Sequence, residues 1–184
     1  MTTETYLDIG SVDTLQQLIG QQLSAYGSDL EIDEGVAAFG VWLKLDQGWV
    51  QLEYEETVVA FDAGFENVES LLKVFPQGGD FPGVESDLHE LTGGITAIHR
   101  IQDRISAIDR NTDQPEWDWW RDGGLRFVLD NGQDLIIHRA ATVGGEVRMR
   151  AGARAEVEPD LLPRHSYQEN QHRRYEFERR EVAL

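Results

Sequence analysis

Three tryptophans lie among four carboxylates in one ten-residue stretch, residues 113–122. A carboxylate pair beside an aromatic platform is typical of a carbohydrate-cleaving cleft, where one acid protonates the leaving group. The ordinary alternative is that the tryptophans anchor a loop to a sheet while the acids serve as turn and cap residues, and we favour it. The residues concerned are Trp117, Trp119, Trp120, Asp113, Glu116, Asp118 and Asp122. We predict that the tryptophans contact a partner and keep a hydrolase using Asp118 and Asp122 as the remaining alternative.

A second candidate contact lies in residues 159–184, where Pro159 and Pro163 bracket a short link and the rest is polar and rich in arginine. Its apolar residues are too sparse to build a core. We expect this segment to be an arm that is disordered, docked on the acidic body, or docked on a neighbouring subunit. The residues in it that we predict to bind a partner are Arg173, Arg174, Tyr175 and Phe177.

Other catalytic and ligand-binding signatures are missing from the sequence. The chain has no cysteine, which excludes disulfides and thiolate metal sites. His89-Glu90 begins like a zinc-protease motif, but Gly93 stands where the second histidine would be. The glycine-rich segments contain neither a Walker lysine nor a Gly-x-Gly-x-x-Gly pattern. The sequence therefore predicts no catalytic residue, no metal and no cofactor.

Net charge is the largest compositional feature of the chain, at −18. Residues 1–100 hold 18 acidic and 3 basic residues, whereas residues 101–184 hold 16 and 13. Scarce lysine beside abundant Asp and Glu fits adaptation to high salt, and a coding bias toward arginine explains it equally well. We do not expect duplex nucleic acid as a partner of the acidic half, because like charges repel.

The second half of the chain is relatively basic, and several of its arginines fall on predicted strands, namely Arg139, Arg148, Arg150 and Arg154. A molecule with one acidic and one more basic half is suited to association with copies of itself or with an oriented protein partner. The alternative is that these arginines pair internally with Asp and Glu.

Hydrophobic spacing predicts the secondary structure. Helical spacing is found from Val12 to Tyr26, from Asn67 to Phe75 and from Val84 to Arg110. Alternation predicts strands at 36–45, 49–54, 57–62, 125–129, 134–139 and 146–150, with Asn131-Gly132 forming a type I′ turn. We therefore expect an α+β fold in which two β-meanders pack against amphipathic helices, with a single domain at 1–158 and the arm at 159–184.

No apolar run approaches the roughly 18 residues of a membrane span, and the N-terminus lacks the pattern of a secretory signal. We expect the protein in the cytoplasm or within an assembled particle. The preferred function is a non-enzymatic binding or structural protein, for example a subunit of a virion- or phage-like assembly. The alternative is an acidic immunity or inhibitor-type protein that neutralises a basic toxin.

Overall fold

The fold is a mostly antiparallel β-sheet, so the predicted α+β class is wrong. The computed structural model describes residues 2–28, 30–33, 35–37, 40–77, 88–139, 146–157, 167 and 169–184. The described strands follow the order β3-β4-β11-β10-β9-β8-β2-β5-β6-β7, with β1 beside β9 and β12 beside β8. Their bounds are β1 Thr2–Thr5, β2 Gln22–Ser28, β3 Glu31–Asp33, β4 Val36–Ala37, β5 Gly40–Leu45, β6 Gly48–Phe61, β7 Phe65–Gln77, β8 His89–Asp109, β9 Gln114–Leu129, β10 Gln133–Arg139, β11 Val147–Ala153 and β12 Arg173–Ala183.

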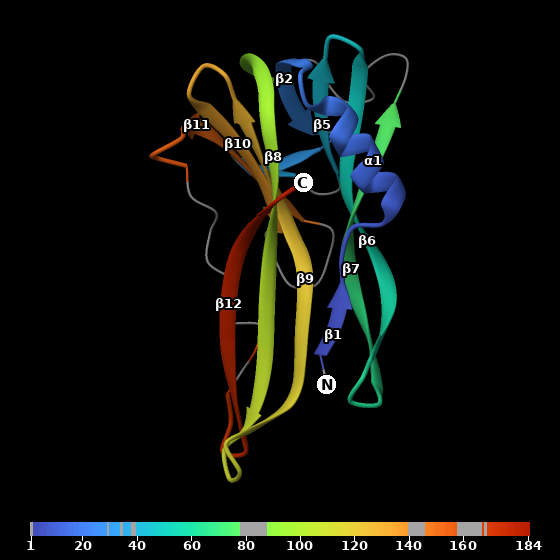
Figure 1. The fold of residues 1–184 in the computed structure, drawn as a ribbon, viewed down its shortest axis with the longest axis vertical. Coiled ribbons are helices and arrows are strands. Elements are labelled where there is room, and N and C mark those ends of the chain that lie inside the picture. Colours follow the sequence, from blue (N-terminus) through green and yellow to red (C-terminus); the bar gives the residue numbers. More distant parts are fainter. Residues whose placement is uncertain are drawn as a thin grey trace.

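Two long antiparallel ribbons run along the molecule (Figure 1). One is the β6–β7 hairpin, which is closed by a turn containing Gly64 at φ +86°. The other is the β8–β9 hairpin, whose lower half is flanked by β12 on one edge and by β1 on the other. The shorter strands β2, β5, β10 and β11 lie at the upper end of the molecule (Figure 1).

The segment predicted as a helix from Val84 to Arg110 is instead strand β8, apart from residues 84–87, which lie outside the described residues. Two features of this strand explain why its isoleucines are three or four residues apart, as they would be on one face of a helix. Thr96 is an extra residue in the pairing with β9, so the alternation changes phase after Ile95. Farther along, Ile98 and Ile101 lie on opposite faces, because apolar cores cover both faces of this strand.

The other two predicted helices are also corrected. The first is α1, which spans Ile9–Leu18 and begins after the cap Asp8, whose side chain accepts from the Ser11 backbone N–H at 2.7 Å. It ends before Gly20, which has φ +93°, and the expected second half is strand β2. The second, expected from Asn67 to Phe75, is strand β7, paired with β6 throughout.

The hairpin predicted at 125–139 is present, but its turn differs from the predicted type. Strand β9 ends at Leu129 and β10 begins at Gln133, so the loop has three residues, 130–132. A type I′ turn requires a positive φ at both central residues. Gly132 has φ +83°, but the φ of Asn131 is not positive. The turn predicted at Gly144-Gly145 and the link from Pro159 to Pro163 lie outside the described residues.

The two largest apolar cores among the described residues occupy opposite faces of the long ribbons. The upper core includes Leu125 and Phe127 of β9, and the lower core includes Trp119 of the same strand. Gly123 is an extra residue in the pairing with β8, so the side chains before and after it alternate out of phase. Strand β6 also changes its buried face, between Tyr54 and Val59, although its pairing with β7 contains no extra residue.

Buried polar side chains fill the middle of the molecule, at the level where β6 and β9 change their buried face. We call this level the waist. These side chains include Tyr54, Glu69, Gln102, Asp103, Arg121, Asp122 and Arg139. Position 123 has room for glycine alone, because a Cβ atom there would lie 2.3 Å from Oδ2 of Asp103. The Tyr54 hydroxyl donates to the Gly123 carbonyl at 2.8 Å and thereby joins the two ribbons.

The described part of the predicted arm is docked on the body. Residues 173–183 form strand β12, which pairs with β8 along its whole length. Charged side chains reinforce the backbone pairing: Arg179 binds Asp103 and Arg126 binds Glu181. Residues 158–166 and 168 lie outside the described residues, and the division at 158/159 remains a prediction.

Candidate functional site

The three predicted tryptophans point to different surroundings because they alternate along β9. Trp119 is 1% exposed and lies in the lower core, where its Nε1 donates to the Thr5 hydroxyl at 2.8 Å. Trp117 lies on the same face at the lower end of that core, in edge contact with Phe61. Trp120 lies on the opposite face, with the guanidinium of Arg180 3.9 Å from its ring.

The four residues of the C-terminal segment that were predicted to bind a partner also lie in different surroundings. Tyr175 and Trp117 flank Ala107 in register, and their ring centroids are 6.0 Å apart. Arg173 donates to Glu116 at 2.5 Å. Phe177 packs against the lower core, and Arg174 binds Asp113 at 2.7 Å. The structure therefore groups Trp117, Trp119, Tyr175 and Phe177 in or against the lower core, places Arg173 beside Trp117, and leaves Trp120 and Arg174 elsewhere.

A cleft of about 430 Å³ lies where Trp117 and Arg173 meet the tip of the β6–β7 hairpin. The hairpin contributes Ala63 and Phe65, and the opposite wall is formed by the Glu116–Arg173 ion pair and Trp117. Phe65 is 39% exposed, and its ring is 6.1 Å from that of Trp117. The cleft thus combines two aromatic surfaces with one ion pair, which suits an apolar side chain with a polar neighbour.

The hairpin tip carries further exposed apolar residues, Val58 and Val68, which are 61% and 48% exposed. Sequence reasoning missed Val68 because it assigned residues 67–75 to a helix. The signal that would have found this hairpin is Gly64, which stands in a short turn between the apolar runs ending at Phe61 and beginning at Phe65.

Carboxylates surround the apolar residues of this hairpin. Residues 48–77 include six Asp or Glu and one lysine. Four of the acids are exposed and have no cation within 4.0 Å among the residues that the structure describes; they are Glu55, Glu56, Asp62 and Glu66. The lower end therefore presents exposed apolar groups in a negative field.

The arginines of the second half are largely paired within the molecule, in contrast to this acidic hairpin. Arg104 binds Asp118, Arg154 binds Asp134, and Arg126 binds both Asp134 and Glu181. Internal pairing was the alternative to a basic surface that attracts other copies. Of the four arginines for which these alternatives were stated, Arg154 has such an internal ion pair, with Asp134, whereas Arg104 and Arg126 were not among the four.

The two carboxylates of the hydrolase alternative are also held by structural partners. Asp118 accepts from Arg104 Nε at 2.7 Å and from the Ser106 hydroxyl at 2.6 Å. Burial opposes the ionisation of Asp118, but these hydrogen bonds outweigh it and lower the pKa of the carboxyl. Asp122 accepts from the Leu7 backbone N–H at 2.7 Å and from the Gln102 amide at 3.0 Å. Neither acid lines the cleft.

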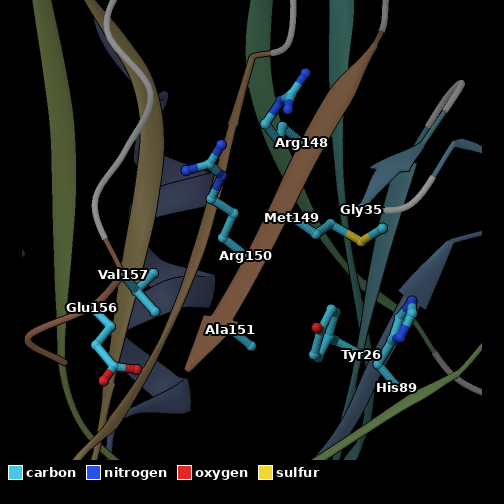
Figure 2. A pocket seen from close by; sticks show the side chains of 9 residues that line it. All are labelled: Tyr26, Gly35, His89, Arg148, Met149, Arg150, Ala151, Glu156 and Val157. Carbon is cyan, nitrogen blue, oxygen red and sulfur yellow. The ribbon is translucent and has the colours of Figure 1, made fainter. Parts of the chain in front are cut away.

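A second pocket of about 430 Å³ lies beside strand β11 (Figure 2). Tyr26 stacks on His89 at 5.0 Å, and His89 Nε2 is 3.0 Å from the Glu31 carboxylate. In Figure 2 the heads of Arg148 and Arg150 point away from Tyr26 and His89. The two arginine heads and the Tyr26–His89 pair therefore do not face a common ligand position. For this reason the pocket is a weaker candidate for a binding site than the cleft at the lower end.

Comparison of the chain with protein-family models, with curated proteins and with solved structures finds no match. Among the described residues, no three His, Asp or Glu side chains are grouped closely enough to hold a metal ion. The helix in the described part, α1, has ten residues, and no helix there has the length and apolar character needed to cross a membrane.

Proposed function

We propose that this chain is a non-enzymatic binding protein that holds a protein partner at its lower end. The observation on which this rests is the cleft between the two ribbon tips, where Phe65 and Trp117 face the Glu116–Arg173 ion pair. Aromatic residues and arginine are the commonest energetic anchors of protein interfaces. The exposed Val58 and Val68 pair with each other on the opposite face of the same hairpin, so the hairpin has apolar groups on both faces.

The charge of the β6–β7 hairpin indicates which kind of partner surface would bind there. The carboxylates of Glu55, Glu56, Asp62 and Glu66, which have no ion pair within the described part of the chain, favour a basic surface. The apolar residues favour an inserted aliphatic or aromatic side chain. A second copy of this chain is a poor match, since it would bring the same acidic hairpin. The partner is therefore a different, basic protein.

This proposal has two forms. In one, the chain is an acidic inhibitor or immunity-type protein that masks a basic toxin. In the other, it is a subunit of a larger particle and contacts a basic subunit. Charge steering supports both, because it accelerates encounter between oppositely charged proteins. A partner that loses a toxic activity on binding would identify the first form, and a partner that joins the chain in a particle would identify the second.

Photo-crosslinking from the hairpin tip tests the proposal. A photoreactive phenylalanine analogue replaces Phe65, and in a matched control it replaces Ile9, an exposed apolar residue at the start of α1. The protein crosslinked from position 65 is then purified, and its affinity is measured by calorimetry at low and high salt. We expect 1:1 binding that weakens with salt and falls about 30-fold or more in Phe65→Ser but not in Ile9→Ser. Equal affinity of both variants would overturn the proposal.

A further inference from the structure

The guanidinium of Arg121 is buried at the waist with unpaired donors. Its side chain is 2% exposed. Neither Nε nor Nη1 has a hydrogen-bond partner in the described part of the molecule. The ring of Trp119 covers one side of the group at 4.7 Å. A buried charged donor without an acceptor is strongly unfavourable, so something outside the described residues should accept these bonds.

The closest carboxylate does not satisfy Arg121. Oε2 of Glu69 is 3.9 Å from Nη1, which is beyond hydrogen-bond distance, and it has no donor of its own. Its Oε1 accepts from Asn67 at 2.9 Å. Burial raises the pKa of Glu69, against the opposing effect of Arg121 and Arg139. The negative charge at Glu69 is thus costly to maintain and poorly placed to neutralise Arg121.

A second cation makes the same region more positive. Arg139 on β10 is 5% exposed, and its guanidinium lies 5.7 Å from the Tyr54 ring. Burial, followed by the charge of Arg121, lowers the pKa of Arg139 to about 10. The waist also holds Asp103, the cross-strand partner of Arg121, but the carboxylate of Asp103 is bound by Arg179.

We propose that the waist binds a small monovalent anion of halide size, chloride being the one generally available, at Nε and Nη1 of Arg121. A halide accepts hydrogen bonds from several directions and needs no shaped recognition surface. Because the Arg121 side chain is 2% exposed and the Trp119 ring covers one side of its guanidinium, larger organic anions are excluded. This inference is independent of the proposed partner site at the lower end.

Crystals grown with sodium bromide in place of sodium chloride give a direct test. Bromide scatters anomalously, so a bound ion appears as a peak that water cannot produce. We expect a peak within hydrogen-bonding distance of Arg121 Nε and Nη1. Water density at that place without an anomalous peak would overturn the proposal, and this readout does not depend on the folding of any variant.

Stability in solution gives a second test. Thermal unfolding is followed in sodium chloride and in sodium gluconate, whose anion is too large for the site, at equal ionic strength. Chloride at about ten times its dissociation constant should raise the ratio of folded to unfolded protein about tenfold over gluconate. Arg121→Gln should abolish this difference. Arg104→Gln, which removes an arginine already paired with Asp118, should retain it. Identical curves for the wild type in both salts would overturn the proposal.

Discussion

The hydroxyl of Tyr54 donates a 2.8 Å hydrogen bond to the backbone carbonyl of Gly123. This bond joins the β6–β7 ribbon to the β8–β9 ribbon at the level where both change their buried face. The ring of Tyr54 belongs to the upper core, while Asp103 and Arg121 lie beside the glycine. Tyr54 therefore fixes the relative position of the two ribbons at the waist.

Replacing Tyr54 by Phe should lower the free energy of unfolding by about 1–3 kcal/mol, because the buried Gly123 carbonyl loses its donor. Urea denaturation followed by tryptophan fluorescence measures the change. Tyr26→Phe is the matched control, since Tyr26 lies partly exposed against His89 and should lose less than about 0.5 kcal/mol. A loss for Tyr54→Phe no larger than that of the control would contradict the role of this hydroxyl.

Gly123→Ala should destabilise the protein by about 2 kcal/mol or more, since its new methyl group would lie 2.3 Å from Oδ2 of Asp103. Asp103 would have to move and weaken its bonds to Arg179, which are 2.5 and 2.9 Å long. Gly10→Ala is the control: its methyl group would be 3.5 Å from the nearest atom, in a helix that alanine favours. The midpoint of thermal unfolding should fall for the first variant and stay level or rise for the second.

Acid should remove the contribution of the α1 cap at a defined pH. The hydrogen bonds from Lys73 and from the Ser11 backbone lower the pKa of Asp8 from 3.8 to about 2. A carboxyl whose pKa is lower in the folded state stabilises the protein above its unfolded pKa, and this stability is lost as the pH falls toward the folded value.

The difference in melting temperature between the wild type and Asp8→Asn should therefore be constant above about pH 5 and shrink between about pH 4 and 2. Adding Lys73→Met to both proteins should make the difference smaller at neutral pH, because the main cause of the shift is removed. A difference that does not vary between pH 5 and 2 would show that Asp8 does not act as a charged cap.

Trp119 and Trp120 should respond very differently to replacement, although they are adjacent in sequence. Trp119→Phe should cost about 2–4 kcal/mol, because it leaves a cavity in the lower core and removes the bond to Thr5. Trp120→Phe should cost less than about 1 kcal/mol, since it mainly weakens the contact with Arg180. Guanidinium titrations of the two variants measure both values, and equal losses would contradict the placement of Trp119 in the core.

Sequence patterns predicted the hairpin strands at 40–54 and 125–139, because each shows apolar residues before and after a glycine-containing turn. The same patterns failed for β8. A bulge at Thr96 and cores on both faces gave its isoleucines the spacing of a helix. No single-sequence rule distinguishes that case, because the second core is built from strands far away in the chain.

The candidate site was predictable only in part. Trp117, Arg173 and Tyr175 were selected for their residue types, but their meeting depends on the pairing of β12 with β8 across more than 60 residues. Phe65 was missed because its neighbours were assigned to a helix. Trp119 was predicted as a contact and lies in the core instead, which follows from its position on the inner face of β9.

The parallel pairing of β1 with β9 places Thr2 opposite Asp118 and therefore imposes an order on folding during synthesis. When β1 leaves the ribosome, its partner strand has not yet been made, and Leu7 has no Asp122 to bond. Hairpins such as β6–β7 join neighbouring segments and can form early, whereas β1 must wait. The lower core should therefore close late, and until then Trp119 stays exposed to chaperones and to other nascent chains.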